Sequence, residues 1–464
     1  PDFVGTRYGG NLARLCAVIV LTVASFTYVT AQINATGTIA SVALDIDFKY
    51  AVYIGLISIL LCSMLGGMRA VTWTQVAQYI VLIIAYLLPI FWISNKMGAG
   101  FFPHFMLADE VARIGELEQQ FGFIKNSAAD LATVPKGLAG ITKAHSAVNA
   151  TPWAFISLAL AMMMGTASLP HVMMRYFTTP SVKAARKSVG WSLFFIFLLY
   201  SSAPMLATLS KLSLIDPTLP TGIIGKSFAE VQSLDWFQNW NQANLMFISD
   251  FNGNGTLELN EFFMGGKAVV LATPEIAGLP YVISGLVAAG GMAAAMSTAD
   301  GLILAIANAI SHDVYYKMID PKAETAKRLL VARVLLVVIG FAGATIAAME
   351  IQGILGSVIW AFDFAMSGLF FPLVLGVWWK RANREGAIAG MVLGLGSAIW
   401  YLVWVRTGGS GFLGLTQLTF GIFGAAVSFV SMVVVSLMTQ EPDKAIQKMV
   451  DEVRIPSGKT VTGK

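Results

Sequence analysis

The sequence predicts an all-α membrane protein, and three observations support that prediction. Hydrophobic residues fill 56% of the 464 positions and charged residues only 12%, whereas water-soluble domains carry about 25% charged residues. The mean hydropathy of the chain is +0.71. Apolar runs of about 20 residues, the length that lets a helix cross a bilayer, recur along the whole chain.

Ten apolar stretches are long enough to cross a membrane. We expect spans at about 10–33, 50–68, 73–96, 152–176, 184–208, 279–312, 327–349, 353–379, 386–405 and 413–438. Together they make residues 1–438 one membrane domain. The intervals 97–151 and 209–278 are expected to be long loops with short helices of their own, and the charged segment 439–464 a mobile tail.

The basic residues indicate how the spans are oriented. Lys and Arg collect in alternate loops, such as 175–187 and 317–328, whereas the loops between them are acidic or mixed. Because cytoplasmic loops are rich in Lys and Arg, we expect both ends of the chain in the cytoplasm and both long loops outside. A bacterial inner membrane is the expected location.

The same charge pattern bears on partners. The net charge is only +4, and the basic residues lie at span ends, which argues against nucleic acid. The lipid bilayer is the expected partner, and a small membrane subunit or a second copy of the chain remains open.

Redox chemistry and structural disulfides are not indicated. Cys16 and Cys62 both lie in apolar runs, so no disulfide framework or CxxC metal site is available. The four histidines come without any haem or flavin motif, which leaves a redox enzyme without ligands. We therefore expect that the protein is not an enzyme.

A polar cluster interrupts the apolar stretch "GGMAAAMSTADGLILAIANAI" at 290–310. Ala294, Ser297 and Thr298 are spaced i, i+3, i+4 and share one helical face. Hydroxyl and carbonyl oxygens on such a face can replace the water around Na⁺. Asp300 follows, and an ionisable residue inside a membrane is functional by default. The alternative is that the hydroxyls bond to backbone carbonyls one turn earlier and only help the helix to pack.

A second interruption lies in "MMMGTASLPHVMMRYF", residues 162–177. Gly165, Thr166, Ser168 and Pro170 can unwind a helix and expose its backbone to a small polar ligand, as in channels and transporters. The alternative is a proline-kinked helix whose Arg175 reaches the membrane surface.

One further acid lies in an apolar run. Asp363, in "IWAFDFAMSGLFFP", could face a cavity, carry a proton or pair with a basic residue of another helix. Gln75 and Gln78, at the start of the third span, could be satisfied at the membrane surface. The sequence does not choose among these roles.

The second long loop contains a calcium-loop pattern, "DFNGNGTLELNE", at 250–261. Gly255 supplies the turn and Leu257 the apolar position of an EF-hand loop. Oxygen ligands are available from Asp250, Asn252, Asn254, Thr256, Glu258 and Glu261. We expect a weak Ca²⁺ site here; a solvated Gly/Asn turn that matches by chance is the alternative.

Five stretches resemble the sodium:solute symporter family, and most closely its branch of acetate and other small monocarboxylate symporters. They are "PDFVGTRYG", "GGMRAVTWTQVAQYIVLI", "GTASLPHVMMRYFTTPSVKAARKSV", "MSTADGLILAIANAISHDVYY" and "GAIAGMVLG". The resemblance implies a LeuT-like fold of two inverted five-helix repeats. It also implies a chain that begins after the first two core helices, so that 10–33, 152–176 and 279–312 correspond to core helices three, six and eight.

The same resemblance implies site residues. The family's sodium positions on core helix eight fall on Ala294, Ser297 and Thr298. This chain has Gln75 where proline- and sugar-transporting relatives carry Asp, so an extra cation at that position is not implied. On core helix six, aromatic residues of those relatives are replaced, which implies a smaller substrate or a different pose. The substrate-lining candidates are Met162, Gly165, Thr166, Ser168 and Pro170.

We therefore expect sodium-coupled symport of a small, acetate-like organic anion by alternating access, with Na⁺ as the coupling ion. Asp300 and Asp363 are candidates for ion- or proton-linked acids. Two alternatives come from other classes: a sensor that keeps the symporter fold, and a subunit of a membrane enzyme complex. The short tail after 439 carries no signalling domain, and the enzyme complex lacks redox ligands.

Overall fold

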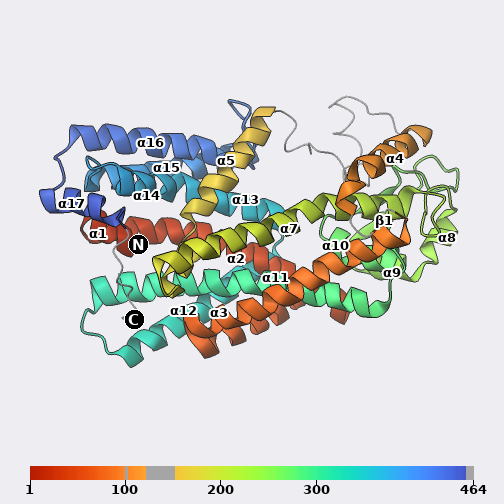
Figure 1. Cartoon of the computed structure of the whole chain (residues 1–464), viewed down its shortest axis with the longest axis horizontal. Coiled ribbons are helices and arrows are strands. Elements are labelled where there is room, and N and C mark those ends of the chain that lie inside the picture. Colours follow the sequence, from red (N-terminus) through yellow and green to blue (C-terminus); the bar gives the residue numbers. More distant parts are fainter. Residues whose placement is uncertain (99, 101–102, 122–151, 456–464) are drawn as a thin grey trace.

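The computed structural model describes residues 1–98, 100, 103–121 and 152–455, and helices dominate these ranges (Figure 1). The long helices are α2 (Asn11–Leu44), α3 (Phe48–Lys96), α5 (Pro152–Ser168), α7 (Val182–Ile215), α11 (Tyr281–Asn308), α12 (Thr325–Ala348), α13 (Ile354–Ala365), α15 (Arg384–Arg406) and α16 (Gly421–Met438). The shorter ones are α1 (Asp2–Tyr8), α4 (Leu107–Gln120), α6 (Pro170–Met173), α8 (Phe228–Gln232), α9 (Asp235–Gln242), α10 (Val269–Ile276), α14 (Phe371–Trp378) and α17 (Lys444–Val453).

Several helices continue into tighter or wider turns. A π-helical segment, Ala309–Ile319, extends α11, and another, Met366–Phe370, joins α13 to α14. A 3₁₀ segment, Met174–Thr178, follows α6.

Within the described ranges, eight helices are long and apolar enough to cross a membrane, and the bent pair α5–α6 gives a ninth. The spans expected at 50–68 and 73–96 both lie in α3, where Gly67 interrupts the helix with φ 56° and ψ −162°. Glycine adopts such a positive φ without strain. The segment before it, Phe48–Met64, is apolar but shorter than the other spans.

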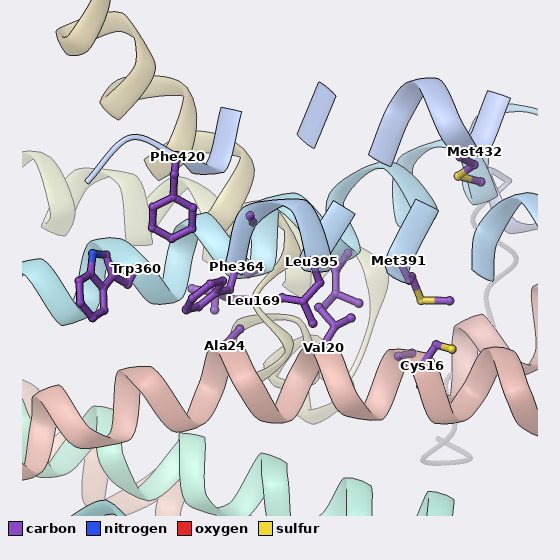
Figure 2. Packing of buried hydrophobic residues seen from close by; sticks show 14 of the residues in the cluster. Cys16, Val20, Ala24, Leu169, Trp360, Phe364, Met391, Leu395, Phe420 and Met432 are labelled. Atoms are coloured by element: carbon purple, nitrogen blue, oxygen red, sulfur yellow. The ribbon is translucent and has the colours of Figure 1, made fainter. Parts of the chain in front are cut away.

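Helix α2 lies at the centre of the membrane domain because it is apolar around most of its circumference. On one side, Cys16, Val20 and Ala24 pack against α13–α16 in a core that includes Trp360 and Met391 (Figure 2). On another side, α2 packs against α3, α11 and α12 through a second apolar core. The central helix therefore contacts both groups of spans.

The two long loops form an extramembrane unit, residues 103–121 and 209–278, at the end of the molecule opposite α1 and α17 (Figure 1). As expected, it contains short helices, namely α4 and α8–α10. It also contains an antiparallel pair of strands, β1 (Met246–Ile248) and β2 (Phe262–Met264), around its own apolar core.

The segment after 438, expected to be mobile, contains the helix α17. Lys380 forms an ion pair with Asp451 at 2.7 Å, and the Arg454 guanidinium lies over the Trp378 ring at 5.5 Å. The expectation missed this helix because a short, charge-rich segment is a stable helix only where a neighbouring surface is available for its apolar side.

Candidate functional site

In the polar turn of α11, around Ser297 and Thr298, two side-chain hydroxyls donate to the same backbone carbonyl. The Ser297 hydroxyl donates to the carbonyl oxygen of Ala294 at 2.9 Å, and the Thr298 hydroxyl donates to the same oxygen at 3.5 Å. All three residues are half-buried. Back-bonding to the helix, the alternative raised by the sequence, therefore occurs. It uses only the hydroxyl protons, so the lone pairs of both hydroxyls remain available to a cation.

Gln75 of α3 contacts the same turn. Its Nε2 donates to the carbonyl oxygen of Ser297 at 2.5 Å. This bond ties α3 to α11 beside the two hydroxyls and supplies that carbonyl with a hydrogen-bond donor. The amide is thus satisfied by a neighbouring helix.

Asp300 lies one turn further along α11 and is fully buried. Its Oδ1 accepts a hydrogen bond from the Ser63 hydroxyl of α3 at 3.0 Å, whereas its Oδ2 has no hydrogen-bond partner among the described residues. Arg175 interacts with it electrostatically. A methyl group added at Gly301 would lie 2.8 Å from the Arg175 Nη2. The missing side chain at Gly301 thus makes room for the guanidinium.

The break in the broken span lies between α5 and α6, which bend by 49°. The sequence predicted an interruption at Gly165, Thr166, Ser168 and Pro170; α5 continues through Ser168, and the break lies within this segment, directly before Pro170. The helix breaks at Leu169 because Pro170 has no N–H to donate and starts the next helix. Thr166 donates within α5, to the Met162 carbonyl at 2.6 Å.

Gly165 has a packing role. A Cβ at this position would lie 2.7 Å from the Phe362 Cβ and 2.8 Å from its carbonyl oxygen. The glycine therefore permits close contact between α5 and α13. Ser168 is buried and donates to the carbonyls of Met164 and Gly165 at 2.8 and 3.0 Å.

Aromatic side chains that the sequence did not single out surround the break. The Tyr28 ring lies 5.7 Å from the His171 ring, edge-on, and 5.7 Å from the Phe362 ring. The His171 Nδ1 is buried and has no hydrogen-bond partner in the described part of the chain. The only signal in the sequence is that tyrosine and histidine are unusual in the middle of a span.

Two cavities border the same stripe of α11, one on each side of the polar turn. The smaller, about 330 Å³, is lined by Tyr86 and, on α11, by Val287, Gly290, Gly291 and Ala294. The larger, about 980 Å³, is lined by Pro170 and, on α11 and its π-helical extension, by Ala305, Asn308, Ala309 and His312. Residues 297–301 line neither cavity, so the polar turn separates them.

Comparison with known proteins identifies the family. The model of the sodium:solute symporter family matches residues 1–212 and 267–394, which is more than half of the chain.

The chain belongs to the sodium:solute symporter family.

Two relatives support this assignment. The chain is 34% identical to an uncharacterised symporter of Cupriavidus necator, over an alignment of 548 positions that covers 98% of this chain and 79% of that protein. It is 27% identical over 399 residues to a monocarboxylic acid transporter of Corynebacterium glutamicum, covering 84% of this chain. The chain spans 62% of that transporter, which is less than two thirds of its length.

A solved structure shows the fold. The substrate-bound, outward-open state of a Na⁺-coupled sialic acid symporter matches with a TM-score of 0.63 and 16% identity, over 96% of this chain and 78% of that chain. At this identity the match concerns the fold alone. The predicted fold class, a helical multi-pass membrane protein of the LeuT-like type, is confirmed.

Asp363 of the symporter is fully buried, and neither of its carboxylate oxygens has a hydrogen-bond partner among the residues described. It lies against Gly421, the first residue of α16, where a Cβ would be 2.7 Å from the Asp363 Cα. No ion pair joins it to a basic residue in the described ranges. Of its three predicted roles, pairing with a basic residue is not observed.

The calcium-loop segment of the symporter connects β1 to β2 and is closed by its own hydrogen bonds. Asp250 accepts from the backbone N–H groups of Gly253 and Gly255, at 2.7 and 3.0 Å. Asn252 and Asn254 each donate to Glu258 Oε1 at 2.9 Å.

The last predicted ligand is also engaged. Glu261 is fully buried and accepts from the N–H groups of Phe251 and Glu258, at 2.9 and 3.0 Å. No group of three or more His, Cys, Asp or Glu side chains in the described residues is arranged to hold a metal. The family model omits 213–266, so calcium binding stays a prediction without support from the fold or the family.

Proposed function

We propose that this symporter couples the entry of Na⁺ to that of a small organic anion, an acetate-like monocarboxylate, by alternating access. The observation that carries the proposal is the stripe of α11. Ala294 borders one cavity, Ala305 borders the other, and the oxygen-rich turn lies between them. In this proposal, an ion bound at this turn lies between the two cavities, and each side of the membrane reaches it through one of them in turn.

The proposed sodium ligands are the hydroxyls of Ser297 and Thr298 and the carbonyl of Ala294. These are neutral oxygens, which replace part of the hydration shell of Na⁺ without binding it so tightly that it cannot leave. Gln75 holds the helix in register by its bond to Ser297.

The proposed substrate site is the break between α5 and α6. Pro170 borders the larger cavity, and the next residue, His171, has its ring against that of Tyr28, which brings two polar side chains to the break. Met162, Gly165, Thr166 and Ser168 stay lining candidates from the resemblance, although Gly165 and Ser168 are committed to packing in this structure. The relative named as a monocarboxylic acid transporter supports a small carboxylate as substrate.

The orientation and location belong to the same proposal. The distribution of Lys and Arg supports α1 and α17 in the cytoplasm and the extramembrane unit outside a bacterial inner membrane. Asp300 and Asp363 remain candidates for ion- or proton-linked acids, because both are buried in spans and incompletely hydrogen-bonded.

Radiolabelled acetate uptake into vesicles containing the full-length protein tests the proposal. We expect uptake with an inward Na⁺ gradient and little with an inward K⁺ gradient. Ser297→Ala removes one oxygen, worth about 1 kcal/mol, so the Na⁺ concentration for half-maximal uptake should rise about five-fold. Ser192→Ala, at an exposed position of α7, is the matched control. Uptake that is equal in Na⁺ and K⁺ would contradict sodium coupling.

A further inference from the structure

Between the two cavities, a side chain from another element packs against α11. The smaller cavity ends at Ala294 and the larger begins at Ala305. Between these residues, on the same stripe of the helix, Gly301 accommodates the Arg175 guanidinium: a Cβ would lie 2.8 Å from its Nη2. The Gln75 Nε2 would lie 3.8 Å from the same point. Arg175 therefore lies against the stretch of this stripe between the two cavities, which borders neither of them.

The guanidinium faces a buried acid at this position. Asp300 is fully buried, receives one hydrogen bond from Ser63, and leaves Oδ2 without a hydrogen-bond partner in the part of the chain described. Its interaction with Arg175 is electrostatic. The arginine comes from the 3₁₀ segment that follows α6, and the acid and the serine come from α11 and α3. Three separate elements thus meet around Asp300: the guanidinium lies against Gly301, next to the acid, without a hydrogen bond to it among the described residues.

We propose that Arg175 and Asp300 form a plug that closes the path between the two cavities, and that Na⁺ leaves its site only when this pair separates. The identity of the ion rests on the proposed function; the plug itself rests on the contacts at Gly301 and Asp300. Arg175 is thereby a positioning residue for ion release.

Two physical effects act on the plug. Moving the half-buried guanidinium away leaves the buried Asp300 without a nearby opposite charge in a low dielectric, so Arg175 stays beside it until water reaches the site. A Na⁺ at Ser297 and Thr298, one turn away from Asp300, repels the guanidinium and offers the carboxylate a second cation. Ion binding therefore reduces the free energy needed to separate the pair.

The position of the break also matters. Arg175 follows the break at Leu169, so the 3₁₀ segment can swing away from α11 while α5 keeps its contact with Phe362. The plug thus has a hinge in the same span.

Cys62 is a native reporter of this opening. It precedes Ser63, is half-buried and interacts electrostatically with Asp300. In a Cys16→Ser background it is the single cysteine of the chain described here. Labelling by a membrane-impermeant maleimide, applied in Na⁺-free buffer to vesicles that expose the α1 and α17 end, measures whether water reaches the plug.

Arg175→Gln should label several-fold faster than the parent and should leak preloaded acetate without Na⁺. Gly301→Ala should act in the same direction without any change in charge, because its methyl group displaces the guanidinium. Arg175→Lys should restore part of the protection. Arg186→Gln, an exposed arginine at the start of α7, is the matched control and should change neither rate.

Labelling and leak that stay at the parental rates in Arg175→Gln, with an unchanged melting temperature, would overturn the plug. Labelling does not depend on coupling, so its outcome is separate from that of the proposed function. If the parent shows no Na⁺-dependent uptake, sodium coupling fails, yet faster labelling in both variants still supports a plug between the cavities.

Discussion

Two buried acids of the extramembrane unit, Glu118 and Asp216, and two in the middle of the spans, Asp300 and Asp363, differ in how they are satisfied. In the extramembrane unit, Lys211 pairs with Glu118, and Arg113 pairs with Asp216. Within the spans, Asp300 accepts one hydrogen bond and Asp363 accepts none from the described residues.

This difference separates acids that stabilise the fold from acids for which we expect a role in transport. An unsatisfied buried carboxylate destabilises the fold, so a chain keeps it only where something other than stability depends on it. We infer that the paired charges hold the extramembrane unit together and that the unsatisfied ones serve transport.

The largest expected effect comes from breaking a pair in the extramembrane unit. Lys211→Met leaves Glu118 buried without its cation, which should lower the free energy of unfolding by about 3–5 kcal/mol. Thermal unfolding in detergent measures this loss. Lys226→Met is the control, because its pair with Glu230 is exposed and contributes about 0–1 kcal/mol. Equal melting temperatures for Lys211→Met and wild type would remove the structural role of the pair.

The next effect concerns the contact that positions the broken span. Gly165→Ala places a methyl group 2.7 Å from the Phe362 Cβ, so crowding should lower stability by about 1–3 kcal/mol. Gly190→Ala, in α7, meets nothing within 4 Å and should be neutral or slightly stabilising, because alanine favours helix. The same thermal measurement on both variants checks the contrast; a stable Gly165→Ala would mean that α5 and α13 adjust freely.

Asp363→Asn tests most directly whether an unsatisfied acid differs from an ion-paired one in its effect on stability. The amide keeps the shape and removes the ionisable group, so stability should be unchanged or increased, whereas Glu118→Gln, in a pair, should lower it. Uptake should fall if transport uses the acid. A loss of stability as large as that of Glu118→Gln would instead show that Asp363 holds the first turn of α16 in place.

The smallest effect is a pH dependence in the extramembrane unit. Burial raises the pKa of Glu275 above its usual value of 4.5, although a hydrogen bond from Trp240 opposes this rise. The folded state therefore binds the proton more tightly than the unfolded state, and stability falls as pH rises from 4.5 through the raised pKa. Glu275→Gln should flatten the melting temperature over this range. A wild-type profile as flat as that of the variant would contradict the shift.

Long apolar runs predicted a helical multi-pass membrane protein, because such runs have few other solutions in a protein of this composition. Within the described ranges, eight helices, or nine with the bent pair, are long and apolar enough to cross a membrane; the boundaries of the ten expected spans stay a prediction. Ala294, Ser297 and Thr298 lie within one helix, where their spacing puts them on one face, and their role as a sodium site likewise stays a prediction.

The contacts that complete the site were beyond the sequence because they join distant residues. Gln75 and Ser297 are 222 positions apart, and Ser63 and Asp300 are 237 apart. The role of Gly165 was open for a related reason: a glycine signals either an unwound turn or a close helix contact, and here Phe362, on another helix, decides between them. Likewise, the strands flanking 250–261 are stabilised by each other rather than by their own composition.

The length of α2 has one more consequence. Its 34 residues, at about 1.5 Å each, form a rod of about 51 Å, against a hydrocarbon layer of about 30 Å. The excess emerges in the extramembrane unit, where Val42 packs against the apolar core and Asp45 accepts a hydrogen bond from Gln242 at 2.9 Å. A change of tilt that adapts this rod to a thicker or thinner bilayer therefore moves the extramembrane unit with it. The thickness of the membrane therefore affects the position of the extramembrane unit relative to the spans.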